Sequence, residues 1–150
     1  MIRFVEPNIH NLHFRSELLN DEDTMSYNHA YGGTIEFTYD KYEEWLNKWN
    51  NSNNRYYRLI FDDEIFVGEE AYYSDNGRYL VSIIIYSKYR NKGYGTAVLN
   101  NIIETAKRNN IKELYDDIAA DNSSINLFLN NGFEIIEKSK DIIRVRKELL

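Results

Sequence analysis

An apolar strand, a glycine-rich turn and the start of a helix follow one another in the stretch Ile83-Ile84-Ile85-Tyr86-Ser87-Lys88-Tyr89-Arg90-Asn91-Lys92-Gly93-Tyr94-Gly95-Thr96. Apolar side chains then recur at helical spacing from residue 95 to about 109, which predicts one long helix. Gly93 and Gly95 allow the backbone to approach a ligand without Cβ clashes. We therefore expect a buried strand that runs into a ligand-binding turn.

The turn has the chemistry of an anion site. The first N–H groups of a helix have no internal partner and, together with the helix dipole, suit a diphosphate. Arg90 and Lys92 can add positive charge at the rim. The turn is not a Walker loop, because no Gly-Lys-Ser/Thr follows, nor a dinucleotide fingerprint, because one glycine is missing and the preceding strands are antiparallel. A tight strand-to-helix turn without a ligand also fits the pattern.

The flanking segments predict a mixed sheet. Three strand-like runs precede the turn, and an Asn76-Gly77 hairpin signal joins the last two. Further strands are expected at 2–5, 112–119, 133–138 and 142–147, and further helices at 9–19, 40–49 and 123–130. The strand-helix-strand step over 79–119 makes one parallel pair with a right-handed crossover. The prediction is one α/β domain over 1–150, with a mostly antiparallel twisted sheet and helices on both faces.

Composition excludes several classes of protein. The 150 residues are 43% hydrophobic and 28% charged, which is typical of a globular domain. The apolar runs are too short to span a membrane, and the polar N-terminal segment predicts a cytoplasmic location. The absence of cysteine removes disulfides, thiolate metal sites and a cysteine nucleophile. A net charge of -6 argues against nucleic-acid binding and favours a neutral or cationic small partner.

Two blocks of the chain resemble the GNAT superfamily of N-acetyltransferases. The first is the strand and turn over 83–95, which is similar to the family's hydrophobic strand and Arg/Gln-x-x-Gly-x-Gly/Ala loop. The second is 121–133, where Asn122 opens a short helix and Gly132-Phe133 closes it. The order of elements is also similar, from residue 1 to about 147. The resemblance implies acetyl-CoA as the cosubstrate, a parallel strand pair splayed around it, and a primary amine of a small molecule or peptide as the acceptor.

The resemblance also implies residue roles. The backbones of Ile83 and Ile85 would pair with the pantetheine arm, and an amide near Ile85 would polarise the thioester oxygen. Asn122 would contact the coenzyme, with Asp121 as the alternative. The coenzyme-binding set is Ile83, Ile85, Arg90, Asn91, Lys92, Gly93, Tyr94, Gly95, Thr96, Asn122 and Phe128.

Position 128 departs from the family pattern. Many members carry a tyrosine there that protonates the departing thiolate, whereas a phenyl ring cannot donate a proton. Phe128 can simply pack in the core, with water or another tyrosine (Tyr94 or Tyr86) as the donor. Alternatively, the protein is a catalytically weak or silent acyl-CoA-binding regulatory module.

Acetyl transfer to an amine also needs a proton acceptor. Glu69 and Glu70 follow Gly68 in a strand, where alternation sends one to each face of the sheet, so one of them could face the acceptor. Both could instead be solvated edge charges. Asp116 and Asp117 on a later strand raise the same question.

The connection over 21–38 is long enough to be functional. By resemblance it covers the acceptor, so Tyr27, His29 and Tyr31 are candidate substrate contacts, with aromatic packing in a surface loop as the alternative. His10, His13 and Glu17 share one helical face that resembles a metal site, but no metal is expected, because a third strong ligand is not evident. The sequence leaves a homodimer open.

Overall fold

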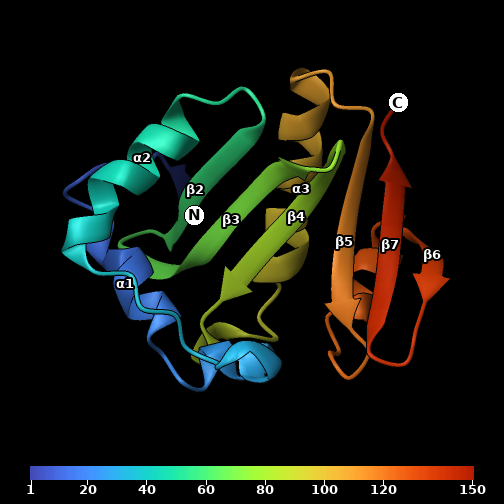
Figure 1. Cartoon of the computed structure of the whole chain (residues 1–150), viewed down its shortest axis with the longest axis horizontal. Coiled ribbons are helices and arrows are strands. Elements are labelled where there is room, and N and C mark those ends of the chain that lie inside the picture. Colours follow the sequence, from blue (N-terminus) through green and yellow to red (C-terminus); the bar gives the residue numbers. More distant parts are fainter.

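The computed structural model describes residues 1–150, which form one seven-stranded sheet in the order β1-β2-β3-β4-β5-β7-β6, flanked by helices (Figure 1). The elements in chain order are β1 (Ile2–Val5), α1 (His13–Leu19), η1 (Thr24–Tyr31), η2 (Tyr39–Lys41), α2 (Tyr42–Asn50), β2 (Arg55–Asp62), β3 (Ile65–Asp75), β4 (Arg78–Ile85), η3 (Ser87–Tyr89), α3 (Tyr94–Arg108), β5 (Glu113–Ala119), α4 (Ile125–Asn130), β6 (Glu134–Lys138) and β7 (Ile142–Glu148). The η segments are 3-10 helices.

One strand pair in the sheet is parallel, and its two strands pair at a single position. All other neighbours pair antiparallel, whereas β4 and β5 run parallel and pair only at Leu80 and Tyr115. Beyond that point the two strands diverge toward their C-terminal ends (Figure 1). The predicted fold class, a mostly antiparallel sheet with one splayed parallel pair and helices on both faces, is confirmed.

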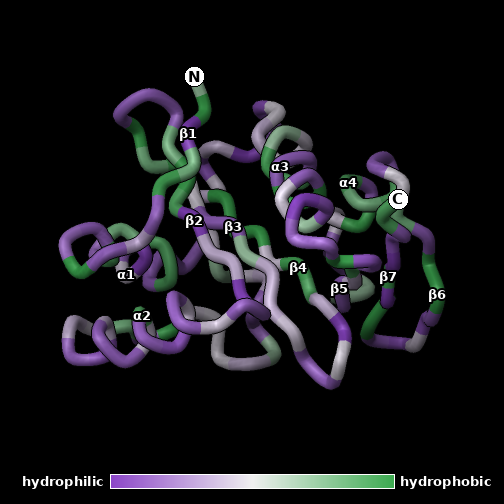
Figure 2. Tube along the Cα trace, turned by 90° about the horizontal axis from the view of Figure 1, so that it is seen from above, coloured by the Kyte–Doolittle hydropathy of each residue, from purple (hydrophilic) through white to green (hydrophobic).

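The sheet separates two apolar layers. The helices α3 and α4 cover one face with a cluster that includes Ile102 and Phe128, and α1 and α2 cover the other with a cluster that includes Leu18 and Tyr42 (Figure 1). Hydrophilic residues occupy the tip of the β3–β4 hairpin and most of α2 (Figure 2). No helix is long and apolar enough to cross a bilayer.

Two glycines allow the backbone geometry found near the two ends of β3. The predicted hairpin turn is confirmed, since Asn76 and Gly77 both have positive φ, at 52° and 80°, as a tight two-residue turn requires. Near the other end of β3 the pairing with β2 shifts register between Ile60 and Phe61. There a Cβ on Gly68 would lie 2.1 Å from the carbonyl oxygen of Ile84, so only glycine fits between β3 and β4.

The N-terminal helix is shorter than predicted. The periodicity indicated a helix from residue 9, but α1 begins at His13. Residues 8–12 form a separate turn, because the Asn8 side-chain oxygen accepts hydrogen bonds from the amides of His10 and Asn11 at 2.8 and 3.0 Å. Asn8 therefore caps this turn and not the helix. The long connection that follows contains η1, with a kink at Asn28.

Candidate functional site

A cavity of about 660 Å³ lies where β4 and β5 part. Its walls come from β4, β5, η1, the glycine-rich turn and the segment that leads into α4. The lining residues are Tyr27, Val81, Ser82, Ile83, Ile85, Tyr89, Arg90, Asn91, Gly93, Tyr94, Gly95, Thr96, Asp116, Asp117, Ile118, Ala119, Asn122, Ser123, Ser124, Asn126, Leu127 and Phe128.

The strand edges that face this cavity carry unpaired backbone groups. The amide of Tyr86 donates to the Val67 carbonyl of β3 at 2.9 Å. Because backbone groups point alternately to the two sides of a strand, the amides of Ile83 and Ile85 point toward β5. No β4–β5 pairing exists at that level. The structure thus places both predicted pantetheine partners on an open edge.

The glycine-rich turn presents free amides at the mouth of the cavity. Asn91 and Gly93 take positive φ, at 63° and 88°, and α3 begins directly after Gly93. No backbone hydrogen bond of the turns and loops has its donor among residues 91–96. The first amides of a helix have no internal acceptor either, so this end of α3 is free to bind an anion. A Cβ on Gly95 would lie 3.1 Å from Leu127, which shows how closely α3 approaches α4.

The guanidinium of Arg90 is held by two backbone carbonyls. Its Nε donates to the carbonyl of Ile85 at 3.2 Å, and one terminal nitrogen donates to the carbonyl of Thr24 at 2.9 Å. The guanidinium therefore ties the end of β4 to η1 while Arg90 also lines the cavity, so its contribution of charge at the rim stays a prediction. Lys92 lies with its ammonium 5.9 Å from the centre of the Tyr89 ring.

The segment around α4 supplies the opposite wall. Phe128 is 3% exposed and packs edge-on against Phe133 at 5.1 Å, so its ring belongs to the core as well as to the cavity wall. Asn122 lines the cavity, and its side-chain oxygen accepts the Ser124 amide at 2.9 Å. Asp121 is exposed instead. Of the two candidates at this position, the structure brings only Asn122 to the cavity.

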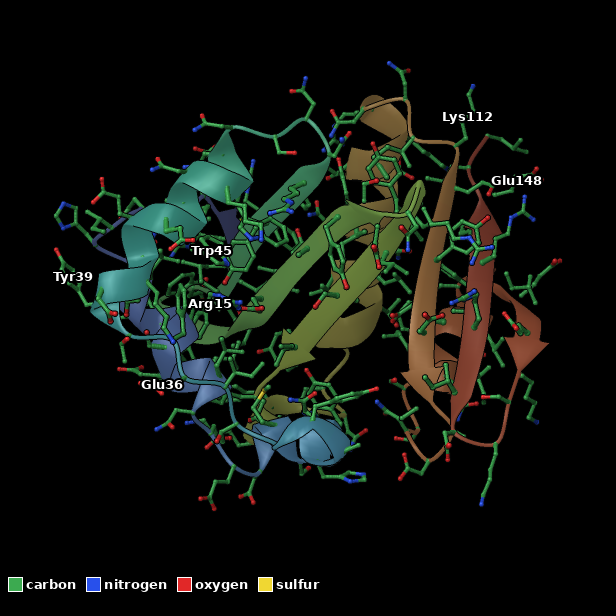
Figure 3. The ribbon with its side chains drawn as sticks, in the orientation of Figure 1. Arg15, Glu36, Tyr39, Trp45, Lys112 and Glu148 are labelled. Atoms are coloured by element: carbon green, nitrogen blue, oxygen red, sulfur yellow. The ribbon has the colours of Figure 1, made fainter.

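The carboxylate of Glu69 is bound by other side chains on the face of the sheet that α1 and α2 cover. It is 4% exposed, and its Oε1 accepts from a terminal nitrogen of Arg15 at 2.6 Å and from the Tyr57 hydroxyl at 2.7 Å. The Arg15 guanidinium also stacks on the rings of Phe37 and Trp45. Figure 3 shows Arg15 and Trp45 together between the helices and the sheet.

Glu70 is buried completely on the α3 face. Its Oε1 accepts from the Tyr56 hydroxyl and the Asn101 amide, both at 2.6 Å, and its Oε2 has no partner. Burial raises the pKa of this carboxyl to about 7. The interpretation of Glu69 and Glu70 as solvated edge charges is therefore wrong, and neither residue lines the cavity.

Asp116 is the carboxylate that the cavity does contain. It is half-buried, its carboxylate accepts from the backbone amide of Asp117, and it forms no ion pair and no hydrogen bond with another side chain. Its neighbour Asp117 also borders the cavity, but that carboxylate is bound to Arg144 at 2.7 and 3.0 Å. Alternation along β5 separates the two side chains. Sequence alone gave no reason to prefer Asp116, because the partner of Asp117 lies on β7.

The three residues predicted to contact the acceptor do not lie in one place. Tyr27 lines the cavity, and its partial burial raises the pKa of its hydroxyl to about 12. Tyr31 is 81% exposed, and the imidazole of His29 lies at the surface, 3.6 Å from the Asp121 carboxylate. Only Tyr27 is positioned to touch a molecule in the cavity.

A second cavity lies at the far end of the sheet. It measures about 720 Å³ and is lined by Arg55, Arg58 and Arg108 near the ends of α2 and α3. It shares no residue with the cavity between β4 and β5. No group of three or more histidine, aspartate or glutamate side chains is arranged to hold a metal ion.

Comparison with known proteins gives a family for the chain. The model of the acetyltransferase (GNAT) family matches residues 16–133. This range includes η1, the sheet from β2 to β5, the glycine-rich turn and α4. No curated protein sequence gives a significant match.

Solved structures of low sequence identity share the fold. An acetyltransferase of the GNAT family from Streptococcus pneumoniae superposes with a TM-score of 0.82 at 23% identity, over 99% of each chain. A spermidine N-acetyltransferase from Vibrio cholerae in complex with CoA and spermine gives 0.81 at 20% identity, over 99% of this chain and 95% of that one. The PaiA N-acetyltransferase from Thermoplasma acidophilum in complex with coenzyme A gives 0.74 at 15% identity, over 99% of both chains.

Proposed function

The chain belongs to the acetyltransferase (GNAT) family, and from this premise we propose that it transfers an acetyl group from acetyl-CoA to a primary amine of a small molecule or peptide. The observation that carries the proposal is the cavity between β4 and β5, which combines open strand edges with the free amides of a glycine-rich turn. Both features suit one ligand, a chain of amide groups that ends in a diphosphate.

The residues of the cavity fit acetyl-CoA, which would supply the acetyl thioester. The amides of residues 91–96 would bind the diphosphate, with Lys92 as the nearby cation. The backbones of Ile83 and Ile85 would pair with the amides of the pantetheine arm, and Asn122 would contact the coenzyme from the α4 side. Arg90 would act indirectly, because it holds the end of β4 in place.

The acceptor is proposed to be a small neutral or cationic amine in the cytoplasm. The chain has a net charge of -6, and the lining of the cavity includes Tyr27 and Asp116. The relative from Vibrio cholerae is a spermidine N-acetyltransferase, which supports an amine of this class. A carboxylate beside the acetyl group would attract such an amine and repel an acidic peptide.

A catalytically silent acyl-CoA-binding module is the second candidate. It is favoured by Phe128, whose buried ring packs on Phe133 and supplies no proton to a departing thiolate. Both candidates predict CoA binding, so binding alone does not separate them.

Two measurements together test the proposal. Calorimetry should show that CoA binds with one site per chain. Thiol release from acetyl-CoA should then be followed with polyamines, aminoglycosides, amino acids and peptides with free N-termini. Amine-dependent release of thiol, with the acetylated amine found by mass spectrometry, supports the enzyme. Binding without release for every amine supports the silent module, and absence of CoA binding refutes both.

A further inference from the structure

Asp116 occupies a special place on β5. It directly follows Tyr115, the one residue of β5 that pairs with β4, so it lies where the two strands begin to part. Its side chain lines the cavity together with Ile83 of β4 and Ile118 of β5. A reacting group that enters between the strands as far as their junction therefore meets this carboxylate.

The other carboxylates of this region are committed to protein partners. On β5 itself, Glu113 accepts from Arg146 at 2.7 Å and Asp117 from Arg144 at 2.7 Å. On β3, Glu69 is bound to Arg15, and Glu70 is completely buried between the sheet and α3. Asp116 alone combines access to the cavity with a side chain that no ion pair or side-chain hydrogen bond holds.

The surroundings of Asp116 favour a proton acceptor. The titratable groups near it are Tyr27 of η1, Tyr73 of β3 and its neighbour Asp117, while Arg90 lines the same cavity but donates to the carbonyls of Ile85 and Thr24. Burial raises the pKa of this carboxyl well above its usual range. A partly buried carboxylate that forms no ion pair is a stronger base than an exposed one, which is what removal of a proton from an ammonium requires.

We propose that Asp116 is the proton acceptor of the acetyl transfer, placed by the parting of β4 and β5 beside the attacking nitrogen. The inference rests on the proposed function and adds to it the catalytic carboxylate that Glu69 and Glu70 do not provide.

An acceptor that arrives as R–NH₃⁺ gives one proton to the Asp116 carboxylate, and the freed lone pair attacks the acetyl carbon. The C–N bond forms, the C–S bond breaks, and the electron pair of that bond leaves on sulfur. The second proton of the nitrogen ends on the sulfur, which gives CoA thiol and the N-acetyl amine. Asp116 then returns the first proton to solvent.

The test uses Asp116→Asn, with Glu113→Gln on the same strand but outside the cavity as the matched control, and the best amine found in the thiol-release assay. Asp116→Asn should lower kcat by ~10²–10⁴-fold, the usual contribution of a positioned base. Its acid limb in the pH profile of kcat/KM should move to the pKa of the free amine, because only amine that is already neutral can then react. The calorimetric affinity for CoA should stay within about twofold of wild type. Asp116→Glu, which keeps a carboxyl group, should recover part of the rate and of the original acid limb.

The possible outcomes separate the two proposals. If wild type releases thiol with an amine and Asp116→Asn keeps its rate and pH profile, the role of Asp116 is refuted while the acetyltransferase stands. That role is refuted as well if Glu113→Gln loses as much activity as Asp116→Asn. If Asp116→Asn fails to fold, Asp116→Ser decides, since an unchanged rate and pH profile in that variant, which has no carboxyl group, also overturns the proposal. If wild type binds CoA but turns over no amine, both proposals fail together.

Discussion

The burial of Glu70 predicts how the stability of the protein depends on pH. Burial raises the pKa of this carboxyl from 4.5 to about 7 in the folded state, which therefore holds a proton that the unfolded chain has released. The free energy of unfolding accordingly falls as pH rises from 4.5 to about 7, and above about pH 7 this contribution no longer changes. At about 1.4 kcal/mol per pKa unit the whole effect is about 3 kcal/mol, of which about 2.5 kcal/mol falls between about pH 5 and about pH 8.

The perturbation is Glu70→Gln, a neutral side chain of the same shape. The Gln oxygen can still accept from Tyr56 and Asn101, while its NH₂ group takes the place of an oxygen that has no partner. The unsatisfied NH₂ costs about 1–3 kcal/mol at every pH. The absolute stability is therefore a poor readout, and the pH dependence is the diagnostic one, because only wild type has a carboxyl to titrate at this position.

The assay is urea denaturation at a series of pH values from about 5 to about 8. The difference in unfolding free energy between wild type and Glu70→Gln should change by about 2.5 kcal/mol in favour of the variant across this range. Glu104→Gln on the exposed side of α3 is the control and should give a constant difference. A constant difference for Glu70→Gln would refute the reasoning. Turnover should survive Glu70→Gln, since this carboxyl lies outside the cavity.

Three further perturbations test other parts of the structure. Gly93→Val forces a β-branched residue to φ +88° and should weaken CoA binding at least tenfold by calorimetry, whereas Gly77→Val, at φ +80° in the β3–β4 hairpin, should leave the affinity unchanged. Phe128→Tyr should leave CoA affinity nearly unchanged, and a rise in kcat of ~10²–10⁴ would show that a phenol can serve at that position, while lost CoA binding would remove Phe128 from the site. Glu69→Gln leaves the buried Arg15 guanidinium without its counter-charge, so unfolding free energy should fall by about 3–5 kcal/mol, and a loss below 1 kcal/mol would contradict the ion pair.

The features that the sequence predicted well are local. The Asn76-Gly77 turn, the alternation along β3 and β4, and the glycine-rich start of α3 each depend on a few neighbouring residues. Such signals survive folding because the backbone geometry that they require is available in any context. The resemblance of two short blocks added the splayed strand pair, which no local pattern shows.

The roles of the charged residues were not predictable, because their partners are distant in sequence. Alternation correctly sent Glu69 and Glu70 to opposite faces of the sheet, but it does not say what covers each face. Arg15 reaches Glu69 across 54 positions, and Arg90 reaches the Thr24 carbonyl across 66. The sequence does not distinguish Asp116 from Asp117 as a candidate proton acceptor for the same reason, since only the fold shows that Asp117 has an arginine beside it.

The open edges of β4 and β5 and the free carboxylate of Asp116 have a common physical basis. Closing the two strands would pair the amides of Ile83 and Ile85, and each such hydrogen bond is worth only about 0.5–1.5 kcal/mol. Closure would also remove the half-buried Asp116, which forms no ion pair, from solvent. Burying an unpaired carboxylate costs several kcal/mol, so the closed pair gains nothing. A ligand that supplies amide groups to the strand edges satisfies the backbone and leaves Asp116 facing the space in which an acceptor amine would bind.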